Sequence, residues 1–437
     1  MSRSWIDPAT ILAPGKAAKL LSEIAADKTA VLPSQAPGLA VQNAPVAPAA
    51  DVGQGARGSA PPPQIGVPPP PAAPVSPAAP KPIQFQQVPR MTELPGQEPS
   101  LAARARPDLP TAAERHQGFV GSYSDPQAMN KSLRQHGKGS LNVVFHGQLA
   151  NGGGYIAKPH EGIGHRDRFR PDEAQRMNDE TFQSLKNDAP ANAERHNATY
   201  DLMSAMGAHH MVAPGMQANM HGAHQFKGAS PDEMDTDEKR LTMAKHHAGG
   251  LAHVQEFIPD TTPVNQASPE QLNQVDSEHR LHGLVSHLLM GNGDAHSANV
   301  LLHKSGHPVL IDHDITLGSS QAQAYKEHFG KPSIRSVFAP GGALDYQAKM
   351  PKDANGQPMP VGTNYPPRMA EVLNRAAEGY YSKGPGALNL SPQDHAVLQQ
   401  NARDLLSHGL EGTLSRRHDI DAEQRAKKAE KVARLKK

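Results

Sequence analysis

The sequence predicts an α+β protein in which a small strand-rich unit is followed by a larger helical unit, with a disordered proline-rich arm before both. Three observations support this fold class. About half of the 41 prolines lie before residue 111, two short strand patterns separated by glycines follow, and helical periodicity recurs through the rest of the chain. At 437 residues, the chain is long enough for two or three domains.

The composition excludes several classes of protein. There is no cysteine, which excludes disulfides, thiolate zinc sites and cysteine nucleophiles. Lys and Arg number 44 against 43 Asp and Glu, so the formal net charge is +1 and nucleic acid is not an expected partner. No run approaches the length of an apolar membrane span, and no secretory signal is evident. We therefore expect a soluble protein.

The arm is assigned to residues 1–112, which are rich in Pro, Ala, Gly and Ser. Such a segment buries too little apolar surface to offset its ordering entropy, so we expect disorder with polyproline II character. One short helix is predicted at about residues 16–27. A flexible tail and a secretion or docking segment that must stay unfolded both fit this composition.

The folded part begins at about residue 115. Strand patterns at 141–145 and 155–157 are separated by Asn151-Gly-Gly-Gly154, which predicts a hairpin. Helical periodicity then occurs at 191–206, 269–289, 367–377 and 392–408. The predicted units are 115–258 (strand-rich), 259–420 (helical) and 421–437 (an exposed basic helix or tail).

One stretch carries most of the chemical information. A helix runs into a loop that starts at Gly291 and contains Asp294 and Asn299, and an apolar strand then ends in Asp312 and Asp314. Phosphoryl transfer needs a carboxylate that accepts a hydroxyl proton, and an amide oxygen and a carboxylate that hold Mg²⁺. Asp294 and Asn299 are five residues apart, as in the kinase catalytic loop. The stretch predicts a nucleotide and metal site.

Two other interpretations fit parts of this stretch. It could be an ordinary polar loop in which Asp312 and Asp314 cap a helix. Alternatively, Asp312-His-Asp314 could be the metal motif of a glycosyltransferase, although that interpretation leaves Asn299 and the strand residue Lys158 without a role. The triplet His165-Arg-Asp167 also has the letters of a kinase motif, but no Asn follows at the required distance and no apolar strand ending in Asp comes after it.

The loop and strand spell Gly291-x-x-Asp294-x-His296-x-x-Asn299 followed by Ile311-Asp312. This pattern resembles the protein-kinase-like superfamily in its atypical branch, which includes phosphatidylinositol 3/4-kinases, HipA-type kinases and aminoglycoside or choline phosphotransferases. No lysine lies between Asp294 and Asn299, and Asp-His-Asp replaces Asp-Phe-Gly, which both favour that branch. The resemblance implies a bilobal fold with an N-lobe over 115–258 and a C-lobe over 259–420. It also implies that His296 supports the catalytic site rather than acting as the base.

Upstream residues supply the N-lobe parts that this resemblance requires. Gly137, Gly139 and Ser140 form a glycine-rich turn whose backbone amides could contact phosphates. Lys158 ends a strand and resembles the lysine that pairs with the α- and β-phosphates. An exposed lysine at the end of a strand would give the same pattern.

A helix and a strand complete this set. Glu194 is the predicted ion-pair partner of Lys158, with His196 close to the equivalent register. The strand at 251–260 resembles the passage into the hinge that lines the adenine pocket, and it contains Gln255, Glu256 and Phe257. A plain buried strand would look the same. Of the chain's histidines, the clusters at 209–210 and 221–224 lie among Gly and Ala, which predicts loops without a metal.

These features predict an ATP- and Mg²⁺-dependent kinase that phosphorylates Ser or Thr of a protein, such as a host protein. Asp294 would accept the substrate proton, and Asn299, Asp312 and Asp314 would hold the metal. The alternatives are a lipid (phosphoinositide) kinase, a small-molecule phosphotransferase, or a pseudokinase that binds partners through the proline-rich arm. The layout also resembles virulence effectors that bacteria secrete into host cells through a type III system, with an ordinary cytoplasmic enzyme as the alternative.

Overall fold

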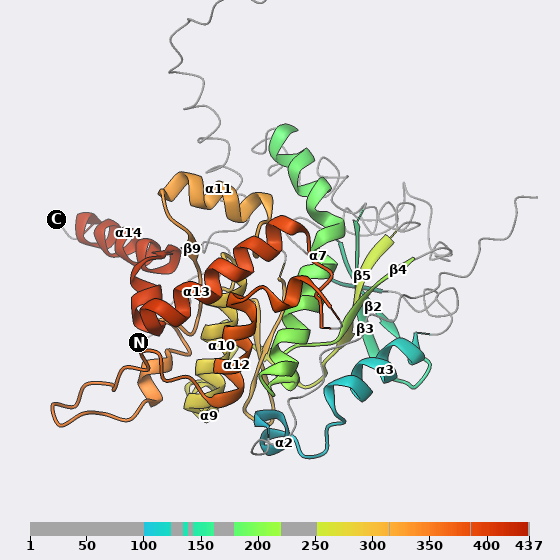
Figure 1. The fold of residues 1–437 in the computed structure, drawn as a ribbon, viewed down its shortest axis with the longest axis horizontal. Helices are drawn as coiled ribbons and strands as arrows, with labels where there is room; N and C mark the ends of the chain where they lie inside the picture. The colour runs from blue at the N-terminus through green and yellow to red at the C-terminus, as the bar shows by residue number, and fades with distance from the viewer. Residues whose placement is uncertain are drawn as a thin grey trace, which may run out of the picture. The chain divides into compact units, whose positions relative to one another are not determined.

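The computed structural model describes residues 100–123, 134–138, 143–160, 179–219, 251–313, 315–384 and 386–435. Within these ranges the fold is mixed α+β, with helices and two small antiparallel sheets (Figure 1). The expected arm up to residue 99, the triplet at 165–167 and the histidines at 221 and 224 lie outside the described residues.

A five-stranded antiparallel sheet forms the first part of the fold. Its spatial order is β1 (Arg134–Lys138), β2 (Val143–Gln148), β3 (Gly154–Pro159), β5 (Leu251–Phe257) and β4 (Gly215–Asn219). The predicted hairpin is confirmed, because β2 and β3 pair with Phe145 opposite Ala157. The strand alternation buries Phe145 and Tyr155 in an apolar cluster with Phe119 and Tyr123.

The packed part of the chain starts earlier than predicted. Helix α2 (Leu101–Ala105) buries Leu101 in the helical core, and the N–H of Ala102 donates to the carbonyl of Gly207 at 2.8 Å. Helix α3 (Ala112–Ser122) follows, capped by Thr111. The boundary at residue 112 is therefore wrong. The composition placed the end of the arm too late, because two of the prolines counted in the arm lie in the short connection between the packed helices α2 and α3.

Helix α7 (Asp179–Ala205) packs on strands β4 and β5 (Figure 1). The predicted helix at 191–206 is confirmed, but the element begins earlier. The predicted start lies directly after Pro190, a residue type that is rare inside helices, whereas the helix continues through that residue. Its C-terminal half is mostly buried. It leads through the short 3₁₀ helix η3 (His209–Met211) into β4, so His209 and His210 are buried in a short helix rather than in the predicted loop.

A second antiparallel sheet consists of β6 (Thr261–Pro263), β7 (Val300–His303) and β8 (Pro308–Leu310). The predicted helix at 269–289 is in fact two helices, α9 (Pro269–Gln274) and α10 (Ser277–Met290). The break has a local cause, because the side chain of Asp276 accepts the N–H of His279 at 2.8 Å and caps α10. Apolar periodicity runs across such a cap without a visible interruption.

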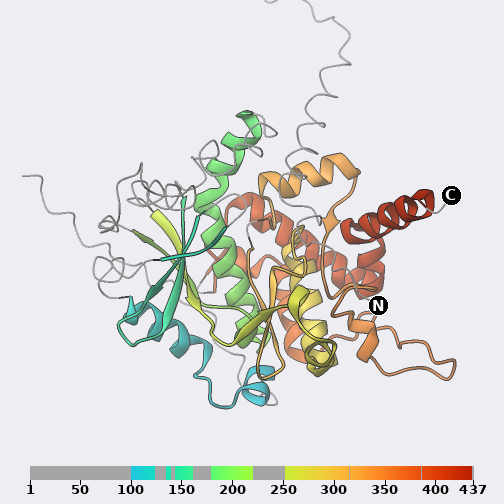
Figure 2. The same ribbon diagram turned by 180° about the vertical axis from the view of Figure 1, so that it is seen from behind.

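The remaining elements are mostly helical. They are η4 (Val264–Gln266), α11 (Ser320–Phe329), β9 (Ser333–Ile334), η5 (Tyr346–Lys349), α12 (Pro367–Ala377), η6 (Tyr380–Ser382), α13 (Pro392–Ser415), β10 (His418–Asp419) and α14 (Ile420–Leu435). Helices α10, α12 and α13 pack together and share one large apolar core (Figure 2). The predicted helices at 367–377 and 392–408 are confirmed, and the second extends past a kink at Gly409. No helix in the described ranges combines the length and hydrophobicity needed to cross a membrane.

Candidate functional site

The loop at 291–299 is fixed by its own backbone. Helix α10 ends at Gly291, whose φ of 60° is the left-handed conformation that glycine adopts without strain. The N–H of Asp294 then donates to the side-chain oxygen of Asn292 at 2.8 Å. Two tight turns follow, in which the N–H of His296 donates to the carbonyl of Asp294 and the N–H of Asn299 to that of His296. The loop therefore presents its side chains from a rigid frame.

The side chain of Asn299 closes this loop. Its Nδ2 donates to the carbonyl oxygen of Asp294 at 2.8 Å and lies 3.4 Å from the carboxylate Oδ2 of the same residue. The five-residue spacing seen in the sequence thus brings the two side chains together. Because the amide nitrogen is used within the loop, the amide oxygen is the group that could bind a cation.

The hairpin of β7 and β8 brings Asp312 to the same place. Val300 is opposite Leu310, and the N–H of Ile311 donates to the carbonyl of Asn299 at 3.0 Å. Asp312 follows directly, with a φ of 61°. A left-handed backbone is uncommon for a residue other than glycine and occurs preferentially at functional sites. Asp314 lies outside the described residues.

Lys158 reaches this hairpin from the five-stranded sheet. Its Nζ donates to Oδ1 of Asp312 at 2.9 Å, although the two residues are 154 positions apart. The side chains are 15% and 37% exposed, respectively. The pairing of Lys158 with Glu194 stays a prediction, beside the ion pair that joins the lysine to Asp312. Glu194 lies on α7, where it is half-buried.

Three buried histidines lie close to this ion pair. His253 is opposite Lys158 in the sheet, and the ring of His196 is 4.5 Å from that of His253 and 5.2 Å from that of His313. Burial lowers the pKa of all three, to about 3 for His313. The three rings are therefore neutral at pH 7 and add no positive charge next to the lysine.

His296 is also neutral and supports the loop. Burial, together with the charge of Arg335, lowers its pKa to about 4. Its Nδ1 accepts the N–H of Ala298 at 3.1 Å, and its Nε2 lies 3.9 Å from a carboxylate oxygen of Asp294. This geometry is that of a residue that orients the loop.

The glycine-rich turn is placed differently from the prediction. Gly137 lies within strand β1, opposite Val144 of β2, because the paired strand extends through the predicted turn. Gly139 and Ser140 belong to the connection between these two strands and lie outside the described residues.

The predicted adenine-binding residues all lie on β5. Gln255 is buried opposite Ile156. Glu256 accepts from the guanidinium of Arg115 at 2.6 Å, and the ring of Phe257 lies against that of His146. Residues 258–260 then connect the five-stranded sheet to β6. This stretch is thus the passage between the two sheets.

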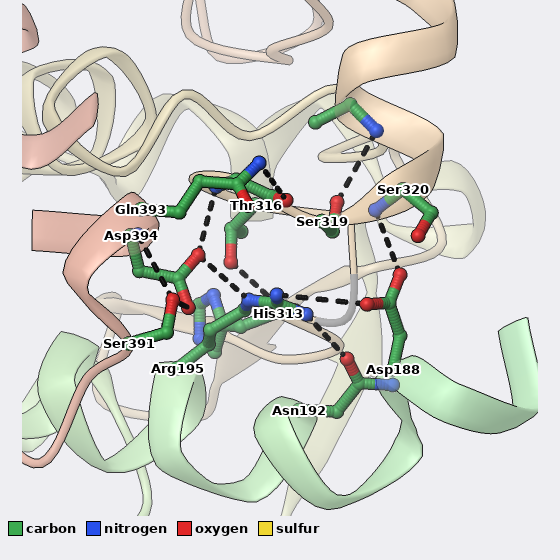
Figure 3. A network of polar contacts seen from close by, with 12 residues as sticks. Asp188, Asn192, Arg195, His313, Thr316, Ser319, Ser320, Ser391, Gln393 and Asp394 are labelled. Carbon is green, nitrogen blue, oxygen red and sulfur yellow. Dashed lines mark hydrogen bonds and ion pairs between the residues drawn. The ribbon is translucent and has the colours of Figure 1, made fainter. Parts of the chain in front are cut away.

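The sequence did not predict the contacts that Arg195 and Arg335 make in this region. Arg195 of α7 donates from Nε to Oδ1 of Asp394 at 3.2 Å, and the same oxygen accepts the N–H of Gly318 at 2.8 Å (Figure 3). This network joins α7, the segment after Asp312 and α13. Arg335 lies 3.5 Å from Asp294. The Ser-x-x-Asp pattern at 391–394 is typical of a helix cap, but no sequence signal shows which distant arginine Asp394 meets.

Comparison with known proteins adds no relatives. No protein-family model matches the chain, and no curated protein matches its sequence. In the described ranges, no group of three or more His, Asp or Glu side chains is arranged to hold a metal ion. The geometry of the site is therefore the basis for assigning a function to the chain.

Proposed function

We propose that this chain is an ATP- and Mg²⁺-dependent phosphotransferase with a bilobal, protein-kinase-like arrangement. The observation that carries the proposal is the pairing of Lys158 with Asp312, next to Asn299 and Asp294. A strand lysine, a loop Asp and Asn, and a carboxylate after the following strand are the parts that kinases use. Here they come from three separate segments and converge on one place.

The order of elements along the chain supports the same proposal. A connection containing Gly139 joins the first two strands, the lysine is on the third strand, and a long helix follows before the fourth. Kinases have their phosphate-covering loop, lysine and helix in these positions. The lobes would extend over 115–258 and 259–420, with ATP between them and the passage at Gln255–Phe257 close to its adenine.

The residues fit a magnesium ion that arrives with its nucleotide. Mg²⁺ prefers oxygen ligands and is commonly held by one or two protein groups together with phosphates and water. The carboxylate of Asp312 and the amide oxygen of Asn299 would supply those groups, with Asp314 as a third candidate. A cluster of three protein ligands is therefore not required. Lys158 would hold the α- and β-phosphates as a point charge.

In the proposed reaction, the hydroxyl oxygen of the acceptor forms a bond to the γ-phosphorus as the bond to the β-phosphate oxygen breaks. The hydroxyl proton passes to the carboxylate of Asp294. His296, which is neutral, holds the loop that carries this carboxylate. The metal, when bound, would neutralise charge on the phosphate oxygens.

For the acceptor we propose Ser or Thr of a protein, with a phosphoinositide or small-molecule hydroxyl as the alternative. Secretion into a host cell through a type III system is proposed only on the composition of the arm. A pseudokinase that binds partners through that arm would bind nucleotide without turnover. A glycosyltransferase would instead hydrolyse a sugar nucleotide in the presence of Mn²⁺.

The test is incubation of the full chain with labelled ATP and Mg²⁺, with and without host extract, followed by detection of labelled protein and lipid. We expect transfer by the wild type, no transfer and no Mg²⁺-dependent ATP binding by Asp312→Asn, and wild-type behaviour of Glu371→Gln. The control residue pairs with Arg375 on α12. Wild-type turnover by Asp312→Asn would overturn the assignment of the site.

A further inference from the structure

Arg335 joins the proposed catalytic loop to the C-terminal helix. Its side chain is 6% exposed and lies between two carboxylates, with Nη1 3.5 Å from Oδ1 of Asp294 and Nε 2.8 Å from Oδ1 of Asp421. Its Nη2 also lies 3.4 Å from the side-chain oxygen of Gln424. Asp421 and Gln424 belong to the first two turns of α14. One guanidinium is therefore shared between the proposed base and a terminal helix.

The backbone around Arg335 runs alongside the catalytic loop. The N–H of Arg335 donates to the carbonyl of Asn292 at 3.2 Å, and the N–H of Val337 donates to that of Ala295 at 3.2 Å. Both acceptors are within two residues of Asp294. A displacement of this segment would therefore move the loop that carries the carboxylate.

The start of α14 is tied to the same segment. Strand β10 pairs in parallel with β9, placing His418 opposite Ser333. The ring of His418 stacks on that of Phe329 with centroids 3.7 Å apart, and its Nε2 is 2.7 Å from a carboxylate oxygen of Glu423. From Arg425 onward, by contrast, the helix is exposed, and both views show it extending beyond the end of α13 (Figures 1 and 2). Within the described part of this helix, the half-buried and buried residues all lie in its first turns.

We propose that Arg335 is a positioning residue for Asp294 and that Asp421 of α14 controls how it is held. This inference rests on the proposed function, because Asp294 is its base. The contact to Asp421 is the shorter of the two, so that carboxylate fixes the guanidinium and leaves only a long contact to Asp294. Without Asp421 the guanidinium would turn toward Asp294 and restrain the group that must accept a proton. Without Arg335 the carboxylate would lose an orienting partner.

The kinetic test uses the full chain, MgATP and basal ATP hydrolysis with water as the acceptor. We expect kcat to fall at least tenfold in Arg335→Gln and about three- to tenfold in Asp421→Asn, with the KM for ATP unchanged within about twofold. Because Asp421 acts through Arg335, the double variant should be no slower than Arg335→Gln alone. Asp421→Glu should recover most of the rate, and Glu430→Gln, on the exposed part of the same helix, should match the wild type.

Additive losses in the double variant, or losses confined to KM, would overturn this positioning role. If Asp294→Asn is inactive while Arg335→Gln and Asp421→Asn both keep the wild-type kcat, the proposed function stands and the inference fails. Should Arg335→Gln not fold, Gln424→Ala with Asp421→Asn repeats the comparison without removing the buried arginine.

A second measurement does not depend on activity. Hydrogen–deuterium exchange of the amides at 292–299 should be slower in Asp421→Asn than in the wild type, because the guanidinium that turns toward Asp294 restrains the loop, and unchanged in Glu430→Gln. If the wild type turns over no ATP, the proposed function fails, and slower exchange would still establish the coupling of α14 to this loop. Unchanged exchange in the loop would show that the helix does not control it.

Discussion

Two charged regions of this molecule differ in how much water reaches them. The proposed site contains Lys158, Asp294 and Asp312, whose side chains are 15%, 26% and 37% exposed. In the network of Figure 3, the paired side chains of Arg195 and Asp394 are only 4% and 1% exposed. The regions are joined by the short segment after Asp312, which belongs to one region at its start and to the other at Gly318.

This difference separates binding from support. A partly exposed ion pair contributes only about 0–1 kcal/mol to stability. Either member can therefore leave its partner and bind a ligand with little loss of stability. A buried pair that loses one partner is destabilised by about 3–5 kcal/mol. The partly exposed charges therefore serve the chemistry of the site. The buried charges hold in place the segment that follows Asp312.

The largest effect is expected for Asp294→Asn. The amide keeps the shape of the side chain but cannot accept the acceptor's proton, and general-base catalysis contributes about 10²- to 10⁴-fold. Phosphoryl transfer should fall by that factor, with the affinity for MgATP retained, as measured by equilibrium nucleotide binding beside single-turnover kinetics.

The free energy of unfolding provides the control for this variant. It should change by less than about 1 kcal/mol in urea titrations, because the side chain is partly exposed. A variant that unfolds easily and binds no nucleotide would place Asp294 with the supporting charges instead.

Arg195→Met tests the buried region. Removal of the guanidinium leaves Asp394 buried and unpaired, so the free energy of unfolding should fall by about 3–5 kcal/mol in urea titrations. Activity per folded molecule should fall less than in Asp294→Asn.

The double variant Arg195→Met, Asp394→Leu distinguishes pairing from packing. It removes both charges, so much of the stability should return. If the double variant is as unstable as the single one, the loss came from packing and the comparison between the two regions weakens.

Local patterns predicted how the loop and the hairpin of the proposed site are arranged. Asp294, Asn299 and Asp312 lie within this loop and hairpin, where Asn299 donates to the carbonyl of Asp294 and accepts the N–H of Ile311. Short spacing along the chain limits how far apart these side chains can lie, so the motif could be recognised from the sequence. The hairpin of β2 and β3 was predicted for the same reason.

Contacts between distant segments were not predictable in this way. Arg195 and Asp394 are 199 positions apart, and nothing in either neighbourhood selects the other. The pairing of Lys158 with Asp312 depends on how the sheet and the hairpin pack. Two predicted helix boundaries were also wrong, because α7 starts earlier and a cap at Asp276 divides the helix predicted at 269–289. Such boundaries depend on single residues, which apolar periodicity does not detect.

Acidification should destabilise the folded protein through the buried ring of His287. Burial lowers the pKa of His287 to about 3 from its usual 6.5. The folded state therefore disfavours the proton that the unfolded state binds. Above pH 6.5 the ring is neutral in both states and its contribution to stability is complete. Below that pH the contribution is lost progressively, by about 1.4 kcal/mol per pH unit, or about 2 kcal/mol between pH 6.5 and 5.

The measurement is the slope of unfolding free energy against pH between 6.5 and 5. His287→Gln should flatten that slope by the share of one proton, whatever its effect on stability at pH 7. Equal slopes in the wild type and His287→Gln would show that this ring is protonated in the folded state.

The smallest effect is expected for deletion of residues 1–99, which are too poor in apolar residues to build a core. Stability and activity should both stay within experimental error of the full chain, so neither charged region should respond. Deletion of residues 1–111 should differ, because it also removes Leu101, whose burial is worth about 1.5–3 kcal/mol. That loss should appear in the unfolding free energy and leave the KM for ATP unchanged. If the shorter deletion already lowers activity, the first 99 residues contribute to the site. The comparison between the partly exposed and the buried charges would then leave out a part of the chain that activity needs.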